Sequence, residues 1–264
     1  MKKTSLSWIK PCLIAVALLF SSFQLVAQST SGVVRCYTDE MDALLRAAHP
    51  EMGSHSDFEQ WIQQEIQNQQ ISGKVIGGVY QIPVVFHVIH NGEAVGTASN
   101  VSYAAIQSQI DVLNEDFRKM FGTPGYNTNP VGADTEIEFC LAKRRPDGSA
   151  FPGGEDGVNR INRTLIGTTA PPFAQTYVES TIKAYTYNNN TPTATRGWDP
   201  AKYMNIWLCD LGNGLLGYAQ FPQSPIGGMG CGTPVMGTDG VVFLYSSIGK
   251  SSVTGFPAPY NEGR

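Results

Sequence analysis

The sequence predicts an α/β fold: a mixed, twisted sheet with backing helices, preceded by a small helical prosegment. Residues 79–89 form a nearly continuous apolar run, which suits a central strand covered on both faces. After Ser102, a possible helix N-cap, apolar side chains repeat at helical spacing as far as Phe117. Residues 203–222 alternate in polarity around a Gly-Asn-Gly turn, which indicates a strand, a turn and a second strand.

The first residues have the pattern of a signal peptide. Lys2, Lys3 and Lys10 form a positive region, residues 13–20 are apolar, and small residues precede Gln28. We therefore expect residues 1–27 to be removed and the protein to be secreted, with no later transmembrane helix. Without these three lysines, 15 of the 18 Lys and Arg remain against 22 Asp and Glu. This balance argues against nucleic-acid and anionic-membrane partners.

Residues 28–78 are interpreted as the helical prosegment. The first helix is expected over Thr38–Ala48, with Thr38 as its N-cap. The second begins near Ser56, whose spacing to Glu59 is that of a capping box. The apolar stripe of this second helix is Phe58, Trp61, Ile62 and Ile66.

Residues 79–264 are long enough for a single domain with a core of its own. Further strands are expected over residues 136–142, 203–211, 215–221 and 240–245, and a short helix over residues 175–185. Residues 143–175 are rich in Gly and Pro and are expected to be a loop. The predicted element order is therefore β-α-β-(α)-β-β-β.

The four histidines do not form a zinc motif. No two of His49, His55, His87 and His90 are four residues apart, the spacing that places two imidazoles on one helix face. His87 and His90 are three apart in a strand, so their side chains point to opposite faces. We expect both to be structural, with ring nitrogens bonded to the backbone.

Two groups of acidic residues have no histidine partner. The first is expected to be a solvated face; its members are Asp111, Glu115, Asp116, Glu136 and Glu138. The second lies in a glycine-containing loop, and its oxygens could hold calcium, although the spacing of an EF-hand is absent. Its members are Asp147, Glu155, Asp156 and Asn159.

Four cysteines follow the signal peptide: Cys36, Cys140, Cys209 and Cys231. In an exported protein we expect pairing, and Cys140 and Cys209 lie in strands that could be neighbours. The alternative is that these two are small buried core residues. Cys36 stands outside any core pattern, and its thiolate would be a strong zinc ligand. The alternative for Cys36 is an ordinary disulfide.

Four stretches together resemble the pappalysin family of secreted zinc metalloendopeptidases, a branch of the metzincins. They are residues 82–90 (IPVVFHVIH), 106–119 (IQSQIDVLNEDFRK), 137–142 (IEFCLA), and 203–222 with the later DGVV at 239–242. The zinc motif of metzincins, H-E-x-x-H-x-x-G-x-x-H, does not occur in these 264 residues. The resemblance therefore implies zinc ligands beyond Arg264, and we expect the chain to be inactive by itself.

The resemblance implies roles for two parts of the chain. Cys36 would be the latency ligand of a cysteine switch, as an Arg-Cys pair near the N-terminus is in pappalysin zymogens. An edge strand would bind the substrate main chain in antiparallel fashion; its residues are Leu216, Gly217, Tyr218, Ala219 and Gln220. The alternative for this strand is a buried hairpin strand.

The expected organisation is a signal peptide (1–27), a prosegment (28–78) and the upper, N-terminal part of a metalloprotease catalytic domain (79–264). The expected function is hydrolysis of peptide bonds in peptide or protein substrates by a secreted, monomeric zinc endopeptidase. The alternative is a secreted, non-catalytic peptide-binding or adhesion protein built on the same sheet.

Overall fold

The computed structural model describes residues 32–50, 53–71, 78–165, 170–183, 198–200, 202–220 and 239–264. The chain divides into two units, Met1–Gly32 and Val33–Arg264. The expected signal peptide and Cys231 lie outside the described residues. Among the helices that are described, none has the length and apolar character needed to cross a membrane.

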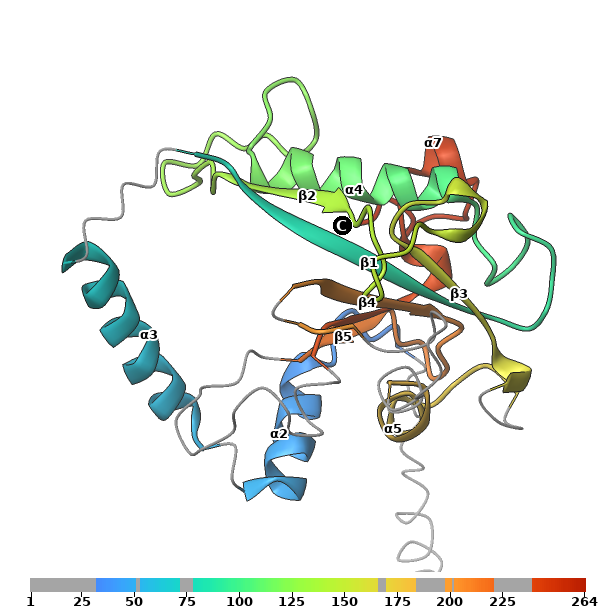
Figure 1. Ribbon diagram of the computed structural model, residues 1–264, viewed down its shortest axis with the longest axis horizontal. Helices are drawn as coiled ribbons and strands as arrows, with labels where there is room; N and C mark the ends of the chain where they lie inside the picture. The colour runs from blue at the N-terminus through green and yellow to red at the C-terminus, as the bar shows by residue number, and fades with distance from the viewer. Residues whose placement is uncertain are drawn as a thin grey trace, which may run out of the picture. The chain divides into compact units, whose positions relative to one another are not determined.

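The second unit is organised by a six-stranded sheet of mostly parallel strands (Figure 1). The strands are β1 (Tyr80–His90), β2 (Ile137–Leu141), β3 (Val158–Asn162), β4 (Met204–Cys209), β5 (Gly217–Ala219) and β6 (Val241–Leu244). Their order is β2-β1-β4-β6-β5, and β3 pairs with the second half of β1. Only the β5–β6 pair is antiparallel. The predicted mixed α/β fold is confirmed.

The central position predicted for residues 79–89 is also confirmed. β1 is parallel to β2, β3 and β4, and six consecutive residues of it are buried. A strand with neighbours on both sides and cover on both faces loses the alternation of an exposed sheet. This explains why its sequence is apolar almost throughout.

Helix α4 (Tyr103–Phe117) covers one face of the sheet. Ile106 and Ile110 pack with Val84, Phe86 and other inward side chains of the strands. The predicted N-cap is confirmed, because the Ser102 hydroxyl accepts a hydrogen bond from the Ala105 amide at 3.2 Å. The short helix α7 (Ser251–Thr254) lies against α4.

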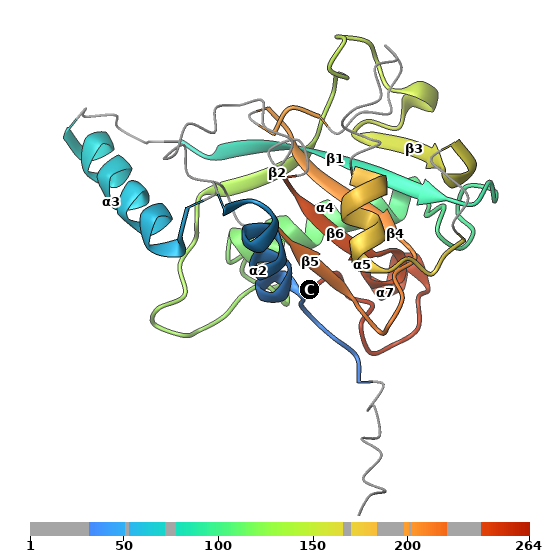
Figure 2. The ribbon, with the colours of Figure 1, turned by 90° about the horizontal axis from the view of Figure 1, so that it is seen from below.

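The opposite face is covered by α2 (Thr38–Ala48) and by α5 (Gln175–Tyr177), which continues into the π-helical η5 (Val178–Lys183) (Figure 2). Met41 of α2 is 4% exposed and joins a core cluster with Trp207 and Tyr218. The remaining elements are α3 (His55–Ile71) and the 3-10 turns η3 (Pro152–Gly154), η4 (Arg163–Leu165) and η7 (Tyr245–Ser247).

The capping box predicted at Ser56 and Glu59 is wrong. The reciprocal bonds are made two residues earlier: the Ser54 amide donates to Asp57 at 2.7 Å, and the Asp57 amide donates to the Ser54 hydroxyl at 3.2 Å. Both pairs have a three-residue spacing, so the sequence pattern alone does not separate them. The expected buried stripe of α3 is only half-buried, and Ile66 is exposed.

The loop predicted over residues 143–175 is wrong in part, because β3 lies within it and pairs with β1. The strand, turn and second strand predicted over residues 203–222 are confirmed as β4 and β5. The two strands are not paired with each other, because β6 is inserted between them. The Gly-Asn-Gly turn therefore connects strands that are neighbours in sequence but not in the sheet.

Two further expectations are wrong: the pairing of the cysteines in disulfides and the exposure of Glu115. Cys36, Cys140 and Cys209 form no disulfide, and β1 separates the strands that carry Cys140 and Cys209. Glu115, expected on a solvated face, is 7% exposed and ion-paired.

Candidate functional site

The outer edge of β5 is the candidate site. β5 is the last strand of the sheet and pairs only with β6 among the strands. Leu216 O and Gln220 N are bonded toward β6, to the Leu244 amide at 2.7 Å and the Gly240 carbonyl at 3.1 Å. Leu216 N, Gly217 O and Ala219 N are bonded on the other side of the strand, away from β6.

Residues 34–38, which we term the edge-covering segment, occupy that side. The Leu216 amide donates to the Val34 carbonyl at 3.0 Å, and the Tyr37 amide donates to the Gly217 carbonyl at 3.2 Å. The bridge between Val34 and Leu215 is parallel. Part of the predicted prosegment therefore lies along the predicted substrate strand as an additional, parallel chain.

Thr38 completes this pairing with its side chain. The Ala219 amide donates to Thr38 Oγ1 at 3.0 Å, and the Cys36 thiol donates to the same oxygen at 3.1 Å. The predicted role of Thr38 as N-cap is wrong: Tyr37 is at the N-cap position, and no side chain caps the helix. The hydroxyl replaces a peptide carbonyl on the edge of β5 instead of capping its own helix.

A pocket of about 560 Å³ lies beside this edge, and we term it the edge pocket. It is lined by Arg35, Cys36, Thr38, Leu216, Gly217, Tyr218, Ala219, Val241, Phe243, Ser247, Tyr260, Gly263 and Arg264. The Arg35 guanidinium lies 5.2 Å from the centre of the Tyr260 ring, a cation–π distance. The structure thus brings together Cys36 and four of the five predicted substrate-binding residues.

The inner side of β5 is anchored by a buried charge. Lys183 is fully buried and pairs with Glu179 at 2.7 Å. Its ammonium lies 5.1 Å from the Trp207 ring centre and 5.3 Å from that of Tyr218. Burial raises the pKa of Tyr218, which therefore stays protonated. The side chain of the central residue of β5 is held in the core while its main chain lies at the edge.

The predicted metal ligands do not converge. In the described parts of the chain, no three His, Cys, Asp or Glu side chains are grouped as a metal site would require. The calcium candidates are engaged separately: Asp147 with Ser149, Glu155 with Arg160, Asp156 with Lys143, and Asn159 with His87.

The structural role predicted for the strand histidines is confirmed by their hydrogen bonds. Buried His87 bonds two amide side chains, Asn205 at 2.9 Å and Asn159 at 3.0 Å, and not the backbone as expected. Burial lowers the pKa of His87 to about 4, so its ring is neutral at physiological pH. His90 Nδ1 accepts from the Gly92 amide at 3.0 Å.

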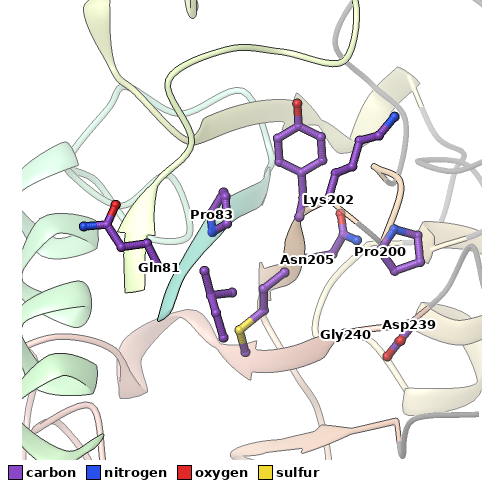
Figure 3. Close-up of a pocket in the computed structure, with 10 residues that line it drawn as sticks. Gln81, Pro83, Pro200, Lys202, Asn205, Asp239 and Gly240 are labelled. Carbon is purple, nitrogen blue, oxygen red and sulfur yellow. The ribbon is translucent and has the colours of Figure 1, made fainter. Parts of the chain in front are cut away.

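A second pocket of about 390 Å³ lies where β1, β4 and β6 begin (Figure 3). Gln81 and Pro83 come from β1, and Asp239 and Gly240 directly precede β6. Asn205 also lines it, but its side chain is already bonded to Trp198 and His87. Burial raises the pKa of Asp239, the acidic group of this pocket.

Comparisons with known proteins give solved structures that resemble this chain. It is 34% identical to mirolysin in complex with compound 9 over 71% of this chain and 60% of that one, with a TM-score of 0.50. It is 30% identical to a promirolysin mutant from Tannerella forsythia over 87% of this chain and 65% of that one, with a TM-score of 0.55. It is 32% identical to mature T. forsythia mirolysin in complex with a cleaved peptide, over 71% of this chain and 60% of that one, with a TM-score of 0.51.

The chain thus spans between 60% and 65% of the length of these solved chains. The promirolysin match covers a larger share of this chain than either mirolysin match. No protein-family model and no curated protein matches the chain.

Proposed function

We propose that the protein is a secreted zinc metalloendopeptidase of the pappalysin family, made as a zymogen with residues 28–78 as its prosegment. The observation that carries this proposal is the edge of β5. Its outward main-chain groups are taken by a separate segment that contains Cys36 and comes from the predicted prosegment. Similarity to promirolysin and to mirolysin with a cleaved peptide supports it.

Substrate binding is proposed to occur by strand addition. Leu216 N, Gly217 O and Ala219 N are the groups now bonded to the edge-covering segment. An extended peptide that replaces this segment can form the same bonds with its own carbonyls and amides. A Cβ at Gly217 would lie 2.6 Å from the Val242 carbonyl oxygen, so glycine at this position allows the close approach of β6.

The prosegment assignment has support from coverage. The match to promirolysin covers 87% of this chain, and the match to mature mirolysin covers 71%. A precursor that retains an N-terminal segment lost on maturation would give this difference. In this proposal Cys36 is the latency ligand, and removal of residues 28–78 opens the edge.

Zinc is part of the proposal, but the described residues do not fit a zinc site. They bring no three suitable side chains together, and Cys36 is the one such side chain that lines the edge pocket. The ligands are therefore proposed to lie outside the described residues, and no catalytic step is assigned to the residues that the structure describes. The role proposed for this chain is to bind and orient the peptide.

The catalytic part of the proposal is tested with the complete product of the gene. We expect it to cleave a protein substrate with zinc only after removal of residues 28–78, and its Cys36→Ala variant to cleave before removal. A Cys36→Ser variant tests whether the thiolate itself is required. If the processed product shows no metal-dependent cleavage, the proposal of a peptidase is wrong.

The binding part is tested separately on this chain. Val34→Pro removes the amide that donates to the Gly214 carbonyl at 2.9 Å, and Val33→Pro is the matched control one residue earlier. A synthetic peptide copying residues 33–38 should bind the Val34→Pro variant and protect the Leu216 and Ala219 amides from hydrogen exchange. If these amides show no protection at saturating peptide, β5 is not a strand-addition site.

The second candidate is a secreted, non-catalytic peptide-binding or adhesion protein. The same edge and the absence of a ligand cluster among the described residues favour it. The two candidates differ in one result, because a binding protein would pass the peptide test and fail the cleavage test.

A further inference from the structure

The polar face of α4 is buried against residues 249–264 of the same chain. Ser108, Gln109 and Glu115 are 4%, 1% and 7% exposed. Acidic and amide side chains are rarely this buried unless they are bonded to a partner. Of the acidic residues predicted to form a solvated face, Glu115 therefore belongs to an internal interface, whereas Asp111 on the same helix is exposed.

Gln109 joins the two ends of this interface. Its Oε1 accepts from the Gly249 amide at 2.8 Å, and its Nε2 donates to the Gly263 carbonyl at 3.0 Å. Gly263 has a φ of +69°, and a Cβ there would lie 2.5 Å from Gln109 Oε1. Residue 263 must therefore be glycine for the chain to lie this close to the helix.

Glu115 supplies the charge of the interface. Its two oxygens accept from Lys250 Nζ at 2.6 Å and from Arg264 Nη2 at 2.7 Å. Arg264 Nε also donates to Asp116 at 3.0 Å. Although burial acts to raise it, the bonds from Lys250 and Arg264 hold the pKa of Glu115 below its usual value.

The segment held in this way forms one wall of the edge pocket. Tyr260, Gly263 and Arg264 line the pocket together with residues of β5, and the Arg35 guanidinium of the edge-covering segment lies over the Tyr260 ring. Helix α4 does not depend on Glu115 for its own position, because Ile106, Ile110 and Val112 are buried, two of them in the core cluster with β1. The ion pairs therefore fix residues 249–264 and not the helix.

We propose that Glu115 is a positioning residue that, through Lys250 and Arg264, holds residues 249–264 in place as part of the lining of the edge pocket. Its importance for substrate rests on the proposed function, since only then does a peptide replace residues 34–38 beside this wall. The holding of the segment itself can be measured without any peptide.

The test compares Glu115→Gln with Asp111→Asn, which makes the same chemical change at an exposed position of the same helix. In Glu115→Gln, amide hydrogen exchange in residues 249–264 should be at least about tenfold faster, because bonds to a charged partner are lost. Exchange in β1 should be unchanged. Alkylation of Cys36 should also be faster, because the ring beneath Arg35 is no longer fixed.

Two outcomes overturn the proposal: unchanged exchange in residues 249–264, or equal acceleration in β1, which would indicate general loss of stability. Glu115→Asp keeps the charge and should recover part of the protection. If Glu115→Gln fails to fold, Lys250→Gln and Arg264→Gln each remove one partner and should each accelerate exchange in the segment. No acceleration in either would also refute it. Failure here leaves the peptide and cleavage tests unaffected.

Discussion

The two outer edges of the sheet are closed by different kinds of group. At β2, the Asn114 side chain from α4 donates to the Phe139 carbonyl at 3.0 Å and accepts from the Phe139 amide at 2.7 Å. At β5, the partner is the main chain of residues 34–38 together with the Thr38 hydroxyl. A side chain on a packed helix leaves only when the domain unfolds, whereas a segment bonded to the edge by a few hydrogen bonds can be displaced or cut away. Of these two edges, β5 is therefore the one suited to exchange partners.

The largest expected effect tests whether the two edges depend on one core. His87 binds side chains of β3 and β4, and its pKa falls from 6.5 to about 4 on burial. The unfolded chain therefore takes up the proton first as pH decreases. The contribution of neutral His87 to the free energy of unfolding is therefore complete above pH 6.5. It is lost progressively toward pH 4, by about 3 kcal/mol in total.

Urea unfolding of the parent and of His87→Gln at a series of pH values measures this effect. The free energy of unfolding should depend on pH more steeply in the parent than in His87→Gln, and this difference should be confined to the range between pH 6.5 and pH 4. The hydrogen-exchange protection factors, which correct for the pH dependence of the intrinsic exchange rate, should fall at β2 and β5 together in the same window. Opening of β5 alone would show that acid acts on the edge-covering segment and not on the shared core.

The second prediction concerns the permanent edge. Asn114→Leu leaves the Phe139 amide and carbonyl without their partner, so the free energy of unfolding should fall by about 2 kcal/mol. Gln107→Leu makes the same change at an exposed position of α4 and serves as the control. Equal urea midpoints for the two variants would mean that Asn114 does not close β2.

The third prediction concerns the removable edge. Thr38→Val removes the acceptor of the Ala219 amide and of the Cys36 thiol. Loss of the bond from the Ala219 amide, about 1 kcal/mol, together with loss of the bond from the Cys36 thiol, should make alkylation of Cys36 at least about fivefold faster without lowering the urea midpoint of the sheet. Thr38→Ser keeps the hydroxyl and should behave like the parent. A Thr38→Val protein with parental alkylation would show that this bond does not hold the segment.

The smallest expected effect is that of Arg35. Its guanidinium stacks on Tyr260, a contact that contributes about 0.5 to 1 kcal/mol at exposed sites. Arg35→Gln should therefore accelerate Cys36 alkylation by about two- to fivefold, and Arg35→Lys by less. A larger effect than that of Thr38→Val would reverse the order assigned to these two contacts.

The sequence predicts elements whose local pattern agrees with their final environment. β1 is apolar because it is covered on both faces, and α4 begins at Ser102 because its hydroxyl is bonded within the helix. β3 is missed because Val-Asn-Arg-Ile-Asn has no clear alternation, and its buried Asn159 is satisfied only by His87 across the sheet. Long-range partners of this kind leave no periodic signal.

The same limit applies to the candidate site. A family resemblance, and no local pattern, points to the β5 residues, and their position at a sheet edge depends on β6, which follows β5 in the sequence but lies between β4 and β5 in the sheet. The burial of Glu115 depends on Lys250 and Arg264, more than 130 residues away. Thr38 has the residue type of an N-cap, yet its hydroxyl is bonded to Ala219 instead. Residue type gives the capacity to bond, and tertiary structure selects the partner.

Because the edge-covering segment is tethered to the strand it covers, its local concentration near β5 does not depend on how dilute the protein is. For short flexible connections this effective concentration is on the order of millimolar. While the tether is intact, the effective concentration of the segment therefore exceeds that of a competing peptide at micromolar concentration by about a thousandfold. After a single cut between α2 and β1, the edge-covering segment would bind β5 as a separate molecule, and its effective concentration would fall to its concentration in solution.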